Sequence, residues 1–424
     1  MPQSYPENFL WGTATSAHQV EGNNINADLW AEEHAEGSPY RDYSGDAINH
    51  YQLYREDILL LAGLGLNSYR FSIEWARIEP EPGIYSSAEI GHYRDVLQAC
   101  KENGITPVVT MHHFTSPRWL MRFGGWKNPQ TADRFAQYCE TVFSELGQDI
   151  PYVVTMNEAN LPVLLKELFV NLDFMPPVGI DGAAWTAPGW REAAALRCGT
   201  TIDKYFTFHM ASDEQSLPIV MDAHKKARTA IKALQPAAKV GLSLALPDVQ
   251  SVAGGEAYAA GKWYDYFGQY KDAIAGDDFL GVQNYAREVY GPQGLIQTAD
   301  TAEEITGMGT EFYPEALAGS IRRVASELTL PIMVTEHGIA TEDDSQRIRF
   351  ISRGLQGLEG CIADGIPVLG YMYWSAFDNF EWTFGYGPHF GVIAVNRDTQ
   401  ERHVKESAHL LGAIARRNTV RALS

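Results

Sequence analysis

The stretch LPIMVTEHGIA, residues 330–340, decides the fold. Pro331 opens an apolar, partly β-branched run, which predicts a buried parallel strand. The run ends at Glu336, and Gly338 then breaks it. Burying a carboxylate costs several kcal/mol unless it is compensated, so proteins keep one mainly where its chemistry is useful. A core strand that ends in a carboxylate therefore marks a candidate functional site.

Strand-like runs of this kind alternate with helix-like stretches along the whole chain. Eight strands are predicted, at residues 9–15, 67–73, 105–113, 152–157, 238–246, 279–285, 331–336 and 367–375. Strand–helix alternation implies a parallel sheet, and eight units favour a closed (β/α)₈ TIM barrel. An open doubly wound sheet is the alternative, but no G-x-G-x-x-G follows an early strand.

Domain organisation follows from the same pattern. No linker or low-complexity tract divides the 424 residues, so we expect one catalytic barrel domain spanning residues 1–424. Residues 160–215 are too many for a simple loop, and they predict extra helices over the C-terminal face of the barrel.

Composition narrows the class of partner. A formal net charge of −20 repels phosphate backbones and anionic lipids, so we expect no nucleic-acid or membrane partner. No apolar run reaches about 18 residues, and the N-terminus lacks a signal-peptide pattern. The four cysteines form no CxxC and indicate free thiols in a reducing compartment. These features predict a cytoplasmic protein, and they leave its oligomeric state open.

Two glutamates at predicted strand ends, Glu158 and Glu336, stand out. In a barrel, the ends of all strands converge at the C-terminal face, where catalysis takes place. A single strand-end glutamate can simply cap the next helix or pair with an arginine. Two that face one another suit glycoside hydrolysis, in which one donates a proton and the other attacks the anomeric carbon or activates water.

Paired carboxylates also occur in metal sites, which usually add histidine or aspartate ligands at short spacing. The adjacent His112 and His113 would point to opposite faces of a strand and could not share one ion. We therefore expect no metal and no cofactor.

Five motifs resemble, in order, those of glycoside hydrolase family 1, the retaining β-glucosidase type. They are FLWGTATSAHQVEG (9–22), YRFSIEWARIEPEPG (69–83), TMNEAN (155–160), TEHG (335–338) and WSAFDNFEWTFGYGPHFG (374–391). The resemblance spans nearly the whole chain and implies the (β/α)₈ barrel. It also implies hydrolysis of small β-glycosides (disaccharides, aryl or alkyl glycosides) with release of a terminal β-D-glucosyl, β-galactosyl or β-fucosyl residue.

The resemblance implies a role for each matching residue. Glu336 would be the nucleophile and Glu158 the general acid/base. Arg70 and Tyr285 would hold Glu336 ionised, so its pKa is expected below that of Glu158. Asn157 would contact the sugar 2-hydroxyl. The other substrate-binding residues would be Gln19, His113, Trp374, Glu381, Trp382 and Phe390.

The chain departs from the family pattern beside the site. His18, Phe114, Ala159, Gln283 and His337 replace residues that are commoner in the family. These changes leave the proposed catalytic set intact and put the preferred glycone in question.

Within the family, Glu381 argues against 6-phosphorylated sugars, because it would repel a phosphate. Two other hypotheses stay open. One is a catalytically silent sugar-binding barrel. The other is an enzyme that is mainly a transglycosidase, which would share all the site residues and differ in loops such as 160–190 and 286–312.

Overall fold

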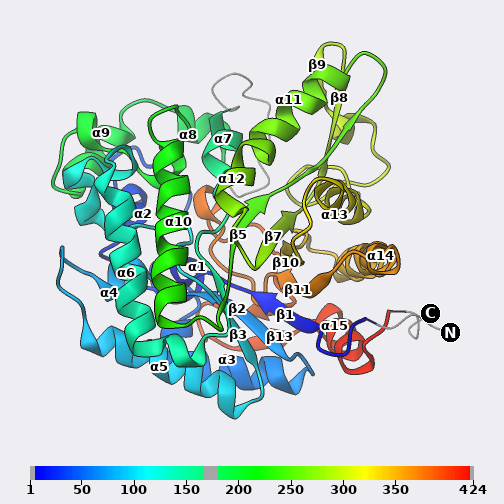
Figure 1. Ribbon diagram of the computed structural model, residues 1–424, viewed down its shortest axis with the longest axis horizontal. Coiled ribbons are helices and arrows are strands. Elements are labelled where there is room, and N and C mark those ends of the chain that lie inside the picture. Colours follow the sequence, from blue (N-terminus) through cyan, green and yellow to red (C-terminus); the bar gives the residue numbers. More distant parts are fainter. Residues whose placement is uncertain (1–4, 167–179, 421–424) are drawn as a thin grey trace.

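The computed structural model describes residues 5–166 and 180–420. Eight parallel strands close into a barrel at its centre (Figure 1). Around the barrel they are β1 (Leu10–Ala14), β2 (Ser68–Ser72), β3 (Thr106–Thr110), β4 (Tyr152–Val154), β5 (Lys239–Ala245), β7 (Phe279–Asn284), β10 (Ile332–His337) and β11 (Val368–Trp374). Each overlaps one predicted strand, so the (β/α)₈ barrel is confirmed and the doubly wound sheet is wrong.

Helices surround the barrel (Figure 1). They are α1 (Ala17–Val20), α2 (Asp28–Glu33), α3 (His50–Gly63), α4 (Trp75–Ile78), α5 (Ser87–Glu102), α6 (Gln130–Leu146), α7 (Leu161–Lys166), α8 (Gly182–Thr186), α9 (Trp190–Arg197), α10 (Leu217–Leu234), α11 (Glu256–Tyr266), α12 (Lys271–Ile274), α13 (Ala316–Glu327), α14 (Asp344–Ala363) and α15 (Glu406–Arg417). No helix of the described residues is long and apolar enough to cross a membrane.

The barrel helices form for local reasons that the sequence carries. In α6 the buried residues Phe135, Tyr138 and Val142 recur every three or four positions, so one face packs inward. The side chain of Ser86 caps α5 by accepting a hydrogen bond from the backbone N–H of Glu89. Gly104, just past α5, has φ +67°, a conformation that favours glycine and ends the helix.

The segment 160–215 carries helices, as predicted. Helices α7, α8 and α9 follow β4, which places their origin at the carboxyl end of the barrel. Residues 167–179 lie outside the described part of this segment.

Two small sheets outside the barrel were not predicted. One has three strands, β6 (Asp248–Ser251), β8 (Arg287–Gly291) and β9 (Gly294–Ile296). It lies with α11 at the upper right of Figure 1. The other is an antiparallel pair, β12 (Ile393–Val395) and β13 (Arg402–Val404). The first sheet builds the rim beside the strand ends of β5 and β7.

Two distant parts of the chain meet beneath β1. The backbone N–H of Tyr5 donates to the carbonyl of Asn418 at 3.2 Å, and the Asn418 side chain donates back to the Tyr5 carbonyl at 2.7 Å. The indole of Trp11 donates to Oδ1 of Asn418 at 2.9 Å. These bonds fasten the beginning of the described chain to α15. The four cysteines are all free and buried, as predicted.

Candidate active site

A cavity of about 250 Å³ lies at the carboxyl ends of the barrel strands. Its lining residues are His113, Phe114, Asn157, Glu158, Tyr285, Glu336, Trp374, Glu381, Trp382 and Phe390. Nine of these ten come from the residues singled out in the sequence, and Phe114 was noted there as a departure from the family pattern. The two remaining residues of that set, Arg70 and Gln19, lie behind the wall.

Glu336 is held by two hydrogen-bond donors. It belongs to β10, where the register against the neighbouring strands shifts between Val334 and Glu336. Nη1 of Arg70 donates to one carboxylate oxygen at 2.6 Å, and the Tyr285 hydroxyl donates to the other. Both donors stabilise the charged form of the carboxylate.

Arg70 is fully buried and joins three strands. Besides Glu336, its Nε donates to the Thr110 side chain at 3.0 Å and its Nη1 donates to the Thr335 carbonyl at 3.1 Å. Its Nη2 donates to Oδ1 of Asn157. A guanidinium fixed by this many acceptors cannot swing away from the nucleophile candidate, so the Arg70–Glu336 pair is rigid.

Gln283 is a functional residue that sequence reasoning missed. It was noted only as a departure from the family pattern, yet its Nε2 donates to Oδ1 of Asn157 at 2.7 Å. With Arg70 and Gln283 both donating to Oδ1, the amide of Asn157 is oriented in one sense. Its Nδ2 is buried and has no acceptor among the described residues. That N–H₂ group is therefore available to a hydroxyl in the cavity.

Glu158 sits in a loop rather than in a strand. The predicted strand 152–157 stops at Val154, and the following residues turn toward the cavity. The Glu158 backbone N–H donates to Oγ of Ser243 at 3.1 Å, and the Asn160 side chain bonds the backbone of Ala245 in both directions. These contacts fix the loop to β5. Neither carboxylate oxygen of Glu158 has a hydrogen-bond partner among the described residues.

The two carboxyl groups differ in their electrostatic surroundings. Burial and the nearby charge of Glu336 raise the pKa of Glu158 well above its usual value. Burial also raises the pKa of Glu336, but Arg70 and the hydrogen bond from Tyr285 oppose the rise. The order matches the one expected from the sequence, with Glu158 above Glu336. The surroundings thus favour the protonated form more strongly at Glu158 than at Glu336.

Backbone strain gathers at the same cavity. Among the described residues, eight that are not glycine have positive φ, and three of them line the cavity: Phe114 (+70°), Glu158 (+40°) and Trp382 (+45°). Each such conformation costs about 1 kcal/mol or more, and it persists where surrounding contacts impose it. Clustered strain of this kind is typical of a functional site.

Aromatic side chains form one wall. The ring of His113 stacks on Trp374 with centroids 5.7 Å apart and on Trp382 with centroids 6.2 Å apart, both at 20°. Gln19 stands behind this wall, where its amide donates to the Phe380 carbonyl at 2.7 Å. Flat apolar faces beside polar edges suit a sugar ring.

The two adjacent histidines separate, although not for the predicted reason. β3 ends at Thr110, so His112 and His113 lie in the following loop rather than in a strand. His113 faces the cavity, whereas His112 packs among Trp126 and Phe208. Within residues 5–166 and 180–420, no group of three or more His, Cys, Asp and Glu side chains could hold a metal ion.

His337, the residue after Glu336, points away from the cavity. Its ring stacks on Phe350 with centroids 4.5 Å apart, and its Nδ1 lies 2.8 Å from the Tyr371 hydroxyl. A Cβ on Gly354 of α14 would lie 2.4 Å from this ring, so the glycine makes room for it.

The next residue, Gly338, is fixed by a different contact. A Cβ on Gly338 would lie 1.8 Å from the Trp374 carbonyl. Glycine is required there because the loop touches β11.

Comparison with known proteins identifies the family. The model of glycosyl hydrolase family 1 matches residues 1–251 and 267–420. The chain belongs to glycosyl hydrolase family 1. The curated β-glucosidase A of Acetivibrio thermocellus is 30% identical over 464 aligned residues, covering 98% of this chain and 99% of its own length.

Solved structures of family 1 agree. The β-glycosidase BGL167 is 49% identical with a TM-score of 0.91, and the match covers 98% of each chain. The β-glucosidase 1317 is 41% identical with a TM-score of 0.88, covering 97% of this chain and 99% of that one. The resemblance drawn from the five motifs is confirmed, and the protein is an enzyme of the glycosidase class.

Proposed function

We propose that this family 1 enzyme is a retaining β-glycosidase with one catalytic domain over residues 1–424, Glu336 as nucleophile and Glu158 as acid/base. One observation carries the proposal. A single small cavity contains one carboxylate held by two donors and one unpaired, buried carboxyl whose pKa is raised. Two carboxyl groups that differ in this way suit double displacement.

The first step forms a glycosyl-enzyme. A carboxylate oxygen of Glu336 attacks the anomeric carbon as the bond from that carbon to the leaving oxygen breaks. The proton of Glu158 passes to the leaving oxygen, which departs as an alcohol. The bond that forms removes the charge of Glu336, and this lowers the pKa of Glu158.

The second step hydrolyses that intermediate. Glu158, now ionised, takes a proton from water while the water oxygen attacks the anomeric carbon. Glu336 leaves as a carboxylate, again stabilised by Arg70 and Tyr285. The two inversions give net retention of the anomeric configuration.

The substrate is a β-glycoside with a terminal, non-reducing sugar. The cavity is small, which favours a single sugar ring and release of one residue at a time. The Nδ2 of Asn157 is placed to donate to the 2-hydroxyl, and this bond strengthens as charge develops at the anomeric carbon. The stacked His113, Trp374 and Trp382 would lie against the ring. Relatives named β-glucosidase support glucose as the first glycone to test.

The test is to trap the intermediate with an activated 2-deoxy-2-fluoro-β-glucoside. An intact-mass increase of one glycosyl unit, mapped to the peptide that contains Glu336, is the expected result. The galacto- and fuco-configured reagents follow if the first does not react. If none of the three labels the protein, the silent sugar-binding barrel replaces this proposal. If the protein is labelled, the ratio of hydrolysis product to transfer product at high acceptor concentration separates a hydrolase from a transglycosidase.

A further inference from the structure

A second pocket opens beside the catalytic cavity. It is open to solvent, and the space between its walls, part of it bulk solvent, is about 980 Å³. Tyr285 and Phe390 line both spaces. Their rings meet edge to face, with centroids 6.0 Å apart and planes at 83°. Because the same two side chains line both spaces, the outer pocket adjoins the catalytic cavity, on the side where a group attached to a bound sugar can extend.

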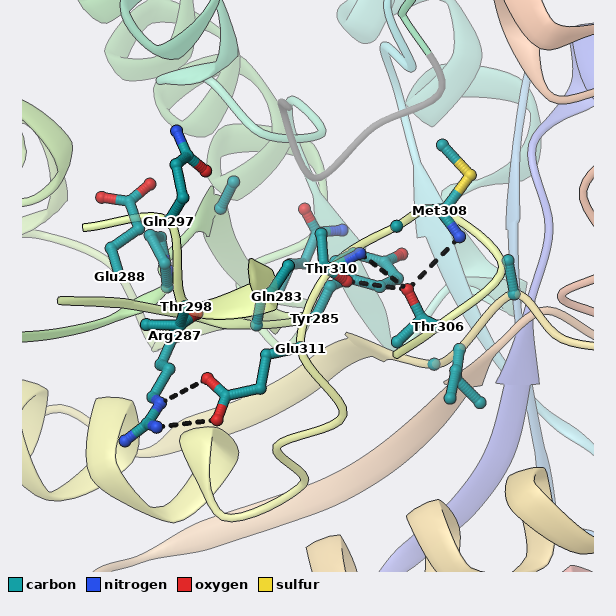
Figure 2. Close-up of a pocket in the computed structure, with 18 of the residues that line it drawn as sticks. Gln283, Tyr285, Arg287, Glu288, Gln297, Thr298, Thr306, Met308, Thr310 and Glu311 are labelled. Atoms are coloured by element: carbon teal, nitrogen blue, oxygen red, sulfur yellow. Dashed lines mark hydrogen bonds and ion pairs between the residues drawn. The ribbon is translucent and has the colours of Figure 1, made fainter. Parts of the chain in front are cut away.

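The outer pocket is built largely by loops outside the barrel. The segment 295–299, which includes the end of β9, and residues 306–311 supply much of its wall. Figure 2 shows Gln283 and Tyr285 between the Arg287–Glu311 pair and the turn that carries Thr306 and Met308. Since Tyr285 also contacts Glu336, the outer pocket adjoins the reacting centre.

The described lining is mainly aliphatic. Its larger apolar side chains are Leu246, Leu295, Ile296, Met308 and Ile339. The aromatic residues of the lining, Tyr285 and Phe390, stand at the boundary with the catalytic cavity. A second sugar ring would find no aromatic face farther out within the described lining.

Several polar groups of this lining are already paired. Arg287 forms a two-bond pair with Glu311, at 2.8 and 2.7 Å, and also donates to Gln250 at 3.1 Å. The hydroxyls of Thr306 and Thr310 lie 2.8 Å apart and are hydrogen-bonded, as the dashed lines of Figure 2 mark. These paired groups gain little from a second sugar, and an alkyl chain leaves their bonds intact.

We propose that the outer pocket binds an extended aliphatic leaving group, so that long-chain alkyl β-glycosides are favoured substrates over disaccharides. The inference rests on the proposed glycosidase function and adds the chemical class of the aglycone. Burial of apolar surface supplies the selectivity, and it acts on the bond-breaking step because the chain remains bound while the bond to the anomeric carbon breaks.

The experiment compares kcat/KM for methyl, butyl, hexyl and octyl β-glycosides of the glycone that the enzyme accepts, with the corresponding disaccharide beside them. Each methylene placed in the pocket should raise kcat/KM about two- to four-fold until the pocket is filled. The octyl glycoside should exceed the disaccharide.

Matched variants locate the effect. Met308→Asp places a charge in the outer pocket and should lower the octyl-to-methyl ratio of kcat/KM at least ten-fold. Ile305→Asp makes the same change three positions away on an exposed side chain outside the lining, and it should keep the wild-type ratio. The chain-length series of the wild-type enzyme needs no variant, so the test holds even if Met308→Asp does not fold.

The outcomes separate the two proposals. If glycosides are hydrolysed but kcat/KM is flat with chain length, or the disaccharide is preferred, the outer-pocket proposal is wrong and the glycosidase function stands. If Ile305→Asp lowers the ratio as much as Met308→Asp, the pocket is not the cause of the selectivity. If no glycoside is turned over, the proposed function fails, and this inference fails with it.

Discussion

Gln283 at the end of β7 donates a hydrogen bond to Asn157 in the loop after β4, across the intervening strand β5. The bond is 2.7 Å long, and its acceptor, Oδ1 of Asn157, also accepts a hydrogen bond from Arg70. Gln283, one of the five departures from the family pattern, thereby helps to orient the amide beside both candidate catalytic carboxyl groups. A positioning role of this kind can be tested apart from catalysis itself.

Gln283→Leu should lower kcat/KM about 10- to 100-fold on a short-chain glycoside, because it removes one of the two donors that orient the buried Asn157 amide. The effect should fall mainly on kcat, since the lost contact matters most in the transition state. Gln250→Leu is the control, because Gln250 bonds Asp248 and Arg287 instead. Equal kinetic losses in both variants would remove the positioning role.

Removing each candidate catalytic carboxyl group should give different products. Glu336→Ala should lose several orders of magnitude in hydrolysis, and added azide should restore turnover as the α-glycosyl azide. Glu158→Ala should retain activity on aryl glycosides whose leaving group needs no proton, and azide should give the β-glycosyl azide. Product configuration by NMR checks both assignments.

Glu315→Ala is the control for the carboxyl variants, because this exposed residue pairs with Arg353 at the surface. Its activity should stay within about two-fold of wild type, since exposed ion pairs contribute little. If the azide products of the two active-site variants were exchanged, the two roles would have to be exchanged as well.

Tyr285→Phe should shift the acidic limb of the pH profile. The Tyr285 hydroxyl favours the ionised form of Glu336, so its removal raises the pKa of that carboxyl. The reaction needs ionised Glu336, and the acidic limb of kcat/KM should therefore move to higher pH. The basic limb of kcat/KM reports the pKa of Glu158, which must be protonated to act as the acid in the first step. Tyr264→Phe, at an exposed position, should leave both limbs in place. An acidic limb that stays fixed in Tyr285→Phe would mean that another group controls it.

Gly354→Ala should destabilise the protein although alanine is the better helix former. Its Cβ would lie 2.4 Å from the His337 ring, and such overpacking costs about 1–3 kcal/mol. Gly91→Ala in α5 meets nothing within 4 Å and should instead gain about 0.5–1 kcal/mol. Thermal unfolding of both variants gives the comparison.

Adding His337→Asn to Gly354→Ala should recover part of the lost stability, because the smaller side chain makes room for the new methyl group. If the double variant is no more stable than the sum of the two single changes predicts, the destabilisation by Gly354→Ala does not come from contact with His337 and has its cause elsewhere in α14.

Much of the barrel was predictable because each strand carries its own apolar run and each helix its own period. The short strands β6, β8 and β9 were not, since each is stable only when paired with distant residues. The end of β4 also differs: the strand-like pattern of the sequence runs on past Val154, but the chain turns after that residue and brings Glu158 into the cavity.

Among the site residues, motif position was enough to locate Glu158 and Glu336 in one cavity. It was not enough for Gln283, whose importance depends on reaching across a strand to Asn157. A departure from the family pattern, two residues before Tyr285, was the signal that could have drawn attention to it. For the outer pocket, the sequence indicated the loop 286–312, which does supply much of its wall. The shape of the pocket could not be predicted, because its walls come from segments that meet only in the folded molecule.

The hydrogen bonds between Tyr5 and Asn418 have a practical consequence. They lie before the start of β1, at the amino ends of the barrel strands. The cavity lies at the opposite end of the barrel, at the carboxyl ends of the strands. A fusion partner or solid support attached beyond either residue would hang beneath the barrel and leave the mouth clear for substrate. Because Tyr5 and Asn418 are in contact, a short peptide bridge could join these two positions, and new termini could be opened in an exposed loop elsewhere.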